Sequence, residues 1–141
     1  MNRLSEVRYE EGIAAGHYDH RRNIDDPLKL FDGLEGTWHP HGIITLKQEG
    51  LDLGNHHHDY DELYFSPTGG FNVWLVDERE PKDMLHFRMT PGSRLLLPEY
   101  VAHRVVGEIG SVLLTYGNVP FNSNRILKSS TESLELLAVG E

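Results

Sequence analysis

The sequence predicts an all-β protein, built as an antiparallel sandwich or barrel. From Trp38 onward, short runs rich in β-branched and aromatic residues alternate with turn residues such as glycine, proline and aspartate, which is the pattern of many short strands joined by tight connections. Little of this region follows a helical period. The length of 141 residues corresponds to one domain. A domain of this size buries about 70% of its unfolded surface and needs no disulfide or structural metal to be stable.

Residues 1–37 precede the strand pattern and are polar, weakly periodic and interrupted by glycine and proline. We expect an N-terminal arm, or first strands, packed on the β domain formed by residues 38–141. Whether this arm lies along a neighbouring sheet or subunit, or is only partly ordered, stays open at this point.

The strands expected in the β domain follow one another at short intervals and are bounded by turn residues. The first covers residues 42–47 and the second carries the histidines of residues 56–58; the others are expected at 62–65, 71–76, 84–90, 94–98, 101–106 and 111–116. The tail, residues 131–139, favours a last strand over a short helix, because Leu134, Leu136 and Ala138 alternate.

The charge and composition of the chain limit the classes of partner that we expect. Lysine plus arginine number 13 and aspartate plus glutamate number 22, which gives a net charge of −9 without a basic stripe, so we expect neither a nucleic-acid nor an anionic-membrane partner. Residues 1–8 lack an apolar core, and no run approaches the roughly 20 apolar residues of a membrane span. A cytoplasmic protein is therefore expected. The chain has no cysteine, which excludes disulfides and thiolate ligands.

Residues 50–69 hold the densest group of chemically active side chains. Side chains at i and i+2 of an extended strand point to the same face, so His56 and His58 project together and His57 points the other way. Glu62 has the same parity as His58 and can return to that face. Two imidazoles and one carboxylate suit a divalent transition metal. The alternative is a solvated surface cluster, which is the commoner role of an isolated histidine run.

The spacing in this stretch resembles the first motif of the cupin superfamily, G(X)5HXH(X)3,4E(X)6G. The matching residues are Gly50, His56, His58, Glu62 and Gly69. The second cupin motif, G(X)5PXG(X)2H(X)3N, is matched in part, at Gly92, Pro98 and His103. Tyr100 replaces its middle glycine and Gly107 its final asparagine. The resemblance covers roughly residues 38–117.

This resemblance implies a single-domain, cupin-type jelly-roll β-barrel that holds one divalent transition metal. The ligands that it implies are His56, His58, Glu62 and His103. Iron, manganese, nickel, cobalt and zinc all suit this donor set, so the sequence leaves the metal open. Because cupins commonly pair through strand exchange or sheet packing, the resemblance also implies a homodimer.

The fold does not fix the function, because cupins include isomerases, epimerases, dioxygenases and plain binding modules. Residues 110–122 more faintly resemble the end of sugar-modifying cupins, although Asn122 stands where those proteins usually have an acid. The first hypothesis is therefore metal-assisted isomerisation or epimerisation of a small oxygenated substrate, a sugar or keto acid. An Fe(II)-dependent dioxygenase and a non-catalytic small-molecule binding or sensing module stay open as alternatives.

The residue that would move the proton in such an isomerisation is not fixed by the sequence. Tyr100, His86 and Glu99 are the candidates, and an outward polar face is an equal alternative for His86. His39 and His41 repeat the i, i+2 spacing, and a half-exposed edge strand is favoured for them over the mouth of the pocket. Three aromatic residues are expected in the core: Tyr64, Phe65 and Trp74.

Overall fold

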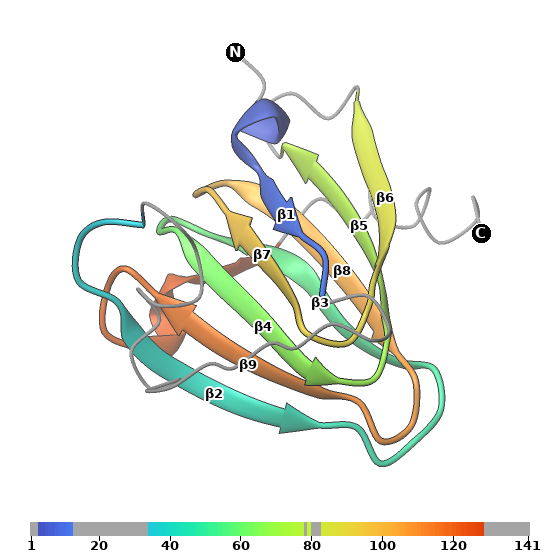
Figure 1. The fold of residues 1–141 in the computed structure, drawn as a ribbon. Coiled ribbons are helices and arrows are strands. Elements are labelled where there is room, and N and C mark those ends of the chain that lie inside the picture. Colours follow the sequence, from blue (N-terminus) through green and yellow to red (C-terminus); the bar gives the residue numbers. More distant parts are fainter. Residues whose placement is uncertain (1–2, 13–33, 78, 80–82, 129–141) are drawn as a thin grey trace.

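The computed structural model describes residues 3–12, 34–77, 79 and 83–128, and two five-stranded antiparallel sheets dominate this part of the chain (Figure 1). In spatial order, the first sheet contains β1 (Arg8–Glu10), β7 (Ser93–Leu97), β4 (Glu62–Thr68), β9 (Val112–Gly117) and β2 (His39–Thr45). The second contains β10 (Ile126–Lys128), β3 (Leu51–His58), β8 (Val101–Gly107), β5 (Phe71–Asp77) and β6 (Met84–Met89). Short 3-10 turns cover Arg3–Glu6 and Ser123–Arg125.

The chain passes repeatedly between the two sheets, since β2, β4, β7 and β9 belong to the first sheet while β3, β5 and β8 belong to the second. This is the jelly-roll arrangement, and the all-β prediction is confirmed. One point is corrected: among the described residues no strand of one sheet pairs with a strand of the other. The two sheets therefore face each other as a sandwich and do not close into a hydrogen-bonded barrel, because their edge strands stay unjoined.

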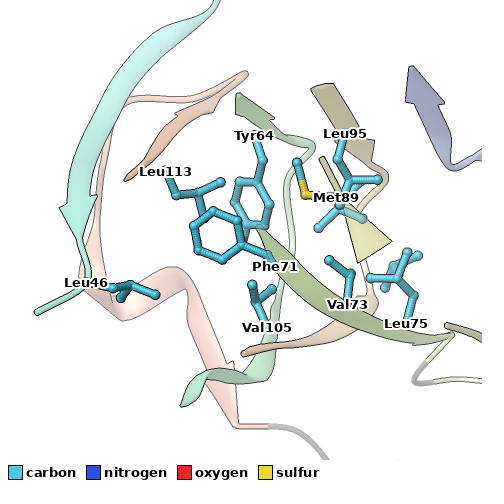
Figure 2. Close-up of a cluster of buried hydrophobic side chains, with 11 residues drawn as sticks. Leu46, Tyr64, Phe71, Val73, Leu75, Met89, Leu95, Val105 and Leu113 are labelled. Atoms are coloured by element: carbon cyan, nitrogen blue, oxygen red, sulfur yellow. The ribbon is translucent and has the colours of Figure 1, made fainter. Parts of the chain in front are cut away.

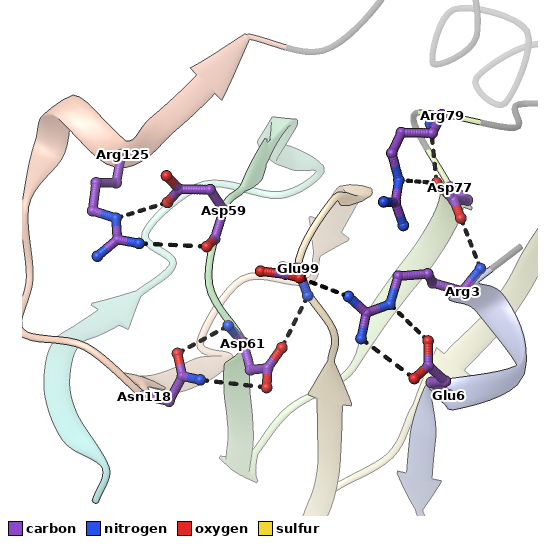
Figure 3. Close-up of polar contacts among 9 residues, drawn as sticks. All are labelled: Arg3, Glu6, Asp59, Asp61, Asp77, Arg79, Glu99, Asn118 and Arg125. Carbon is purple, nitrogen blue, oxygen red and sulfur yellow. Dashed lines mark hydrogen bonds and ion pairs between the residues drawn. The ribbon is translucent and has the colours of Figure 1, made fainter. Parts of the chain in front are cut away.

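Part of the N-terminal region is a strand of the first sheet. β1 pairs with β7, with Tyr9 opposite Leu95. The preceding 3-10 turn is held by Arg3, whose backbone N–H donates to Asp77 at 2.7 Å and whose guanidinium donates to Glu99 at 2.9 Å (Figure 3). The remainder of the expected arm, residues 13–33, and the expected last strand at 131–139 lie outside the described residues.

The main core lies between the sheets and follows the alternation of the strands. Phe71, Val73 and Leu75 of β5 are fully buried on the inner face, whereas Trp74 and Val76 belong to another buried cluster on the opposite face. Figure 2 shows the inner cluster. Its other buried members are Leu46, Tyr64, Met89, Leu95, Leu97, Val101, Val105 and Leu113. The expected burial of Tyr64, Phe65 and Trp74 is confirmed. None of the helical turns in the described ranges has the length and apolarity needed to cross a membrane.

Candidate functional site

Three histidine side chains from two neighbouring strands of the second sheet converge. His56 and His58 come from β3, and His103 lies on β8 opposite His56 in the strand register. One ring nitrogen of each histidine lies within 4.8 Å of the others, and the Nε2 atoms of His56 and His103 are 3.0 Å apart. His58 and His103 are buried and His56 is half-buried.

A bulge in β3 sets this register. Gly54 pairs with Arg104 and His56 pairs with His103, so β3 carries one extra residue at this point. Gly54 has a φ of 120°, and a Cβ atom there would lie 2.5 Å from the carbonyl oxygen of His103. Only glycine permits this approach of the two backbones. The bulge thus places the His56 ring beside the His103 ring.

The first sheet contributes a carboxylate and a phenol from β4. Glu62 Oε2 lies 3.3 Å from His58 Nε2, and Glu62 Oε1 lies 3.7 Å from His103 Nε2. A hydrogen bond of 2.8 Å joins the Tyr64 hydroxyl to His103 Nε2. Glu62 is only 6% exposed, so the carboxylate and the three imidazoles form one polar group across the two sheets, buried except for part of His56.

Burial favours the neutral form of two imidazoles of this group, those of His56 and His103. It lowers the pKa of His103 to about 3 and also lowers the pKa of His56. Burial acts to raise the pKa of Glu62, but the neighbouring His58 and His103 outweigh it, and that pKa lies below its usual value. His56 and His103 therefore present neutral imidazole lone pairs beside the Glu62 carboxylate.

This donor set fits a divalent cation. Within the described residues, His58 Nε2 and Glu62 Oε1 are buried and have no aligned hydrogen-bond partner. Leaving such atoms unsatisfied is costly, and a shared cation would satisfy both. Neutral imidazoles with one carboxylate suit first-row transition metals. The structure thus brings together the four residues that the sequence predicts as ligands, and their ligand role stays a prediction.

The four side chains lie in the wall of a pocket of about 230 Å³. Most of the remaining wall is apolar and is formed by Ile44, Leu53, Val105, Leu113, Phe121 and Ile126. Further polar groups in the wall belong to His41, Tyr60, Tyr64 and Thr115. A mostly apolar pocket with a few converging polar groups is the usual form of a small-molecule site, and this volume lies below the roughly 300–1,000 Å³ typical of drug-sized ligands. A small substrate fits it.

The structure does not place the expected proton-moving residues in this pocket. His86 is exposed on β6 and stacks on Trp74 with ring centroids 4.6 Å apart. Tyr100 lies in the turn before β8, with the Arg79 guanidinium 4.8 Å above its ring. The Glu99 carboxylate is bound to Arg3. None of these three candidates lines the pocket, because each belongs to an outer face or an outer turn.

Tyr100 explains how the turn forms without the glycine of the cupin motif. Its φ is 67°, in the left-handed region that costs a non-glycine residue about 1–2 kcal/mol. Its backbone N–H donates to the carbonyl of His58 at 2.8 Å. This bond ties the turn before His103 to the end of β3. His57 does not line the pocket, and its ring lies 6.1 Å from that of Tyr100.

Four polar residues of the pocket wall were not assigned to it from the sequence: His41, Tyr60, Tyr64 and Thr115. Tyr60 and Tyr64 lie two residues from His58 and Glu62, respectively, and this spacing on an extended chain predicts that they point to the same face as those candidate ligands. The Tyr60 ring packs against the His58 ring at a tilt of 31°, with centroids 4.6 Å apart, and burial raises the pKa of its phenol well above the usual value. His41 lies on the expected edge strand and is half-buried, but the structure also places it in the pocket wall.

Neither a protein-family model nor a curated protein sequence matches this chain. Solved structures, in contrast, match its fold over most of its length. The sugar 3,4-ketoisomerase of Thermoanaerobacterium thermosaccharolyticum, solved with TDP-4-keto-6-deoxyglucose, has a TM-score of 0.64 and 15% identity, and 94% of each chain is covered. The TDP-quinovose 3,4-ketoisomerase of Campylobacter jejuni has a TM-score of 0.64 and 12% identity, over 94% of this chain and 99% of that chain.

A third match is the dTDP-4-dehydrorhamnose 3,5-epimerase of Bacillus anthracis, with a TM-score of 0.63 and 14% identity, over 86% of this chain and 77% of that chain. At such identities the similarity establishes the fold alone. It confirms, at that level, the resemblance to cupins and to sugar-modifying cupins that the motifs indicated. The chain therefore has the cupin fold.

Proposed function

We propose that this protein is a metal-dependent isomerase or epimerase that acts on a small oxygenated substrate, such as a sugar or keto acid. The observation that carries the proposal is the buried group of His56, His58, His103 and Glu62 in the wall of a small pocket. The similarity in fold to sugar 3,4-ketoisomerases and to a 3,5-epimerase supports the reaction class.

In this proposal His56, His58, His103 and Glu62 hold one divalent transition metal, either iron, manganese, nickel, cobalt or zinc. When bound, such a cation polarises a carbonyl oxygen and stabilises negative charge on it. The apolar wall excludes water from the same space, which strengthens electrostatic interactions there. The size of the pocket selects for small substrates.

The experiment is a turnover screen of protein stripped with a chelator and then reloaded with each of the five cations. Aldoses, ketoses and keto acids are the substrates, and interconversion is followed by NMR. Turnover by a loaded form that is absent from the stripped form and from His58→Ala supports the proposal. Background turnover with every cation and every substrate class would contradict it.

The Fe(II)-dependent dioxygenase is a second candidate, favoured by the apolar wall beside a donor set that suits ferrous iron. Oxygen consumption that requires both Fe(II) and an organic substrate would select it over the isomerase. Binding of a substrate without conversion, measured by calorimetry, would instead select the non-catalytic binding module. The three outcomes exclude one another for any one substrate.

Two further expectations are kept as proposals beside this function. The resemblance to cupins implies a homodimer, and the sequence favours a cytoplasmic location. The edge strands β2 and β6 are available for sheet pairing within the described part of the chain. Light scattering of the full chain is expected to give twice the mass of one chain, and a monomeric mass would contradict the dimer.

A further inference from the structure

We infer that His41 is the general base of the pocket and that it accepts a proton from a substrate carbon at its Nδ1 atom. This inference rests on the proposed isomerase or epimerase function, which needs a group that moves a proton between neighbouring carbons. Four features of the fold carry it: the course of β2, the hydrogen bond made by the other ring nitrogen, the loop that supplies the acceptor of that bond, and the aromatic residues that hold the ring.

The first feature is a bulge that turns His41 into the pocket. Pro40 pairs with Tyr116 and Gly42 pairs with the next residue of β9, Thr115, so His41 is an extra residue in β2. Bulges redirect side chains and are over-represented beside active sites. Gly117 of β9 leaves the space for the ring, because a Cβ atom at Gly117 would collide with His41 Cε1. A side chain of an edge strand thereby reaches the pocket wall.

The second feature fixes the tautomer of the ring. His41 Nε2 lies 2.8 Å from the carbonyl oxygen of Val119. A carbonyl oxygen can only accept a hydrogen bond, so Nε2 carries the hydrogen and donates it. The lone pair of the neutral ring is then on Nδ1. A base oriented by an acceptor on its other nitrogen is the general arrangement of catalytic histidines.

The third feature is the rigidity of the loop that supplies the carbonyl. Asn118, next to Val119, donates its backbone N–H to the Asp61 carbonyl at 3.1 Å, and its side-chain oxygen accepts from the Asp61 backbone N–H at 3.0 Å. The Asp61 carboxylate also accepts from the Glu99 backbone N–H at 3.0 Å. Figure 3 shows the contacts that Asp61 makes with the Asn118 side chain and with the Glu99 backbone N–H. The loop is thus fixed to the residue that directly precedes Glu62.

Aromatic contacts hold the ring next to the candidate metal ligands. The His41 ring makes edge contacts with Tyr60 and Phe121, at centroid distances of 5.4 and 5.5 Å. The Tyr60 ring in turn packs at a tilt against the His58 ring, with centroids 4.6 Å apart. One aromatic ring therefore contacts both the proposed base and a proposed ligand, so that a small substrate in the pocket can meet both at once.

The proton transfer balances without a further reactant. The C–H bond next to a substrate carbonyl breaks, its proton passes to His41 Nδ1, and its electron pair moves toward the carbonyl oxygen to give an enolate or enediolate. The proton then returns from Nδ1 to the former carbonyl carbon, while the proton of the neighbouring hydroxyl passes to the former carbonyl oxygen, and this gives the isomer. Nothing is oxidised or reduced overall.

The first test reads the tautomer directly. Full-length protein with ¹⁵N-labelled histidine, loaded with diamagnetic Zn(II), is examined by long-range ¹H–¹⁵N NMR, and His41 is assigned by its loss in His41→Gln. We expect a neutral His41 ring with hydrogen on Nε2 and none on Nδ1. Hydrogen on Nδ1 would overturn the inference.

The second test uses hydroxyacetone as the probe, with deuterium exchange at its carbons followed in D₂O. Glutamine at position 41 retains an N–H for Val119 but removes the base, so we expect exchange to fall about 100-fold or more while Zn(II) content stays unchanged. The matched control is His39→Gln on the same strand, which should exchange like the wild type. If the wild type exchanges and His41→Gln exchanges at the same rate, the role of His41 is overturned and the proposed function stands. If the wild type does not exchange, the proposed function is overturned and the role of His41 with it.

Discussion

Gly54 is the position at which the site geometry depends most on a single residue. Its φ of 120° is rarely adopted by residues with a side chain, and a Cβ atom there would lie 2.5 Å from the His103 carbonyl oxygen. Gly54→Ala therefore combines a conformational cost of about 1–2 kcal/mol with a steric cost of about 1–3 kcal/mol. We expect a loss of about 2–5 kcal/mol in the free energy of unfolding, measured by urea denaturation.

Gly50 supplies the matched control for this experiment. It also has a positive φ, of 68°, but a Cβ atom there would meet no atom within 4 Å. Gly50→Ala should therefore cost only the conformational part, about 1–2 kcal/mol. Because relief of the clash at Gly54 must move β3 away from β8, Gly54→Ala should also weaken Zn(II) binding, which Gly50→Ala should leave unchanged. Equal stability and equal Zn(II) affinity of the two variants would refute the role assigned to the bulge.

Three further predictions follow from the same contacts. Excess Zn(II) should raise the melting temperature of the wild type, because binding at 100 times Kd stabilises the folded state by about 2.7 kcal/mol. His103→Ala should abolish most of this rise, and His86→Ala should keep it. Calorimetry that shows the rise in His103→Ala but not in His86→Ala would exclude His103 as a ligand. Burial acts to raise the pKa of Asp77, but hydrogen bonds from two backbone N–H groups lower it below 3.8. Its carboxylate thus stabilises the fold above about pH 4 and loses this effect as the pH falls. Asp77→Ala should accordingly cost about 1.5–3 kcal/mol at neutral pH and less in acid, and a cost independent of pH in urea titrations would contradict this. Asn118→Ala should release the loop that holds the Val119 carbonyl and give a mixture of His41 tautomers by NMR with unchanged Zn(II) content; a single unchanged tautomer would show that the loop needs no such clamp.

Much of the candidate site was accessible from the sequence because strand geometry is local. The i, i+2 spacing of His56 and His58 places both on one face whatever the partner strand, and Glu62 keeps their parity. His103 is remote in the chain, and its inclusion came from the resemblance to cupins. Its position opposite His56 depends on the β3 bulge, which the conformation of Gly54 produces and no local pattern reveals.

The expectations that the structure did not support concern faces and edges. His86 alternates on β6, but which face of an edge strand turns inward depends on its pairing with β5, and the structure places His86 outside. His41 lies on an edge strand as expected, but its place in the pocket wall was not favoured, although Pro40 and Gly42 on either side are typical of a bulge. Closure into a barrel likewise depends on pairing between the edge strands of the two sheets. The sequence of one strand does not show which strand it pairs with.

Elemental mass spectrometry of the purified full chain tests the central claim most directly. We expect about one divalent transition metal per chain after native expression or reloading, and less than a tenth of that in His58→Ala protein that remains folded by circular dichroism. Wild-type protein that stays free of metal after incubation with iron, manganese, cobalt, nickel and zinc in turn would contradict the account.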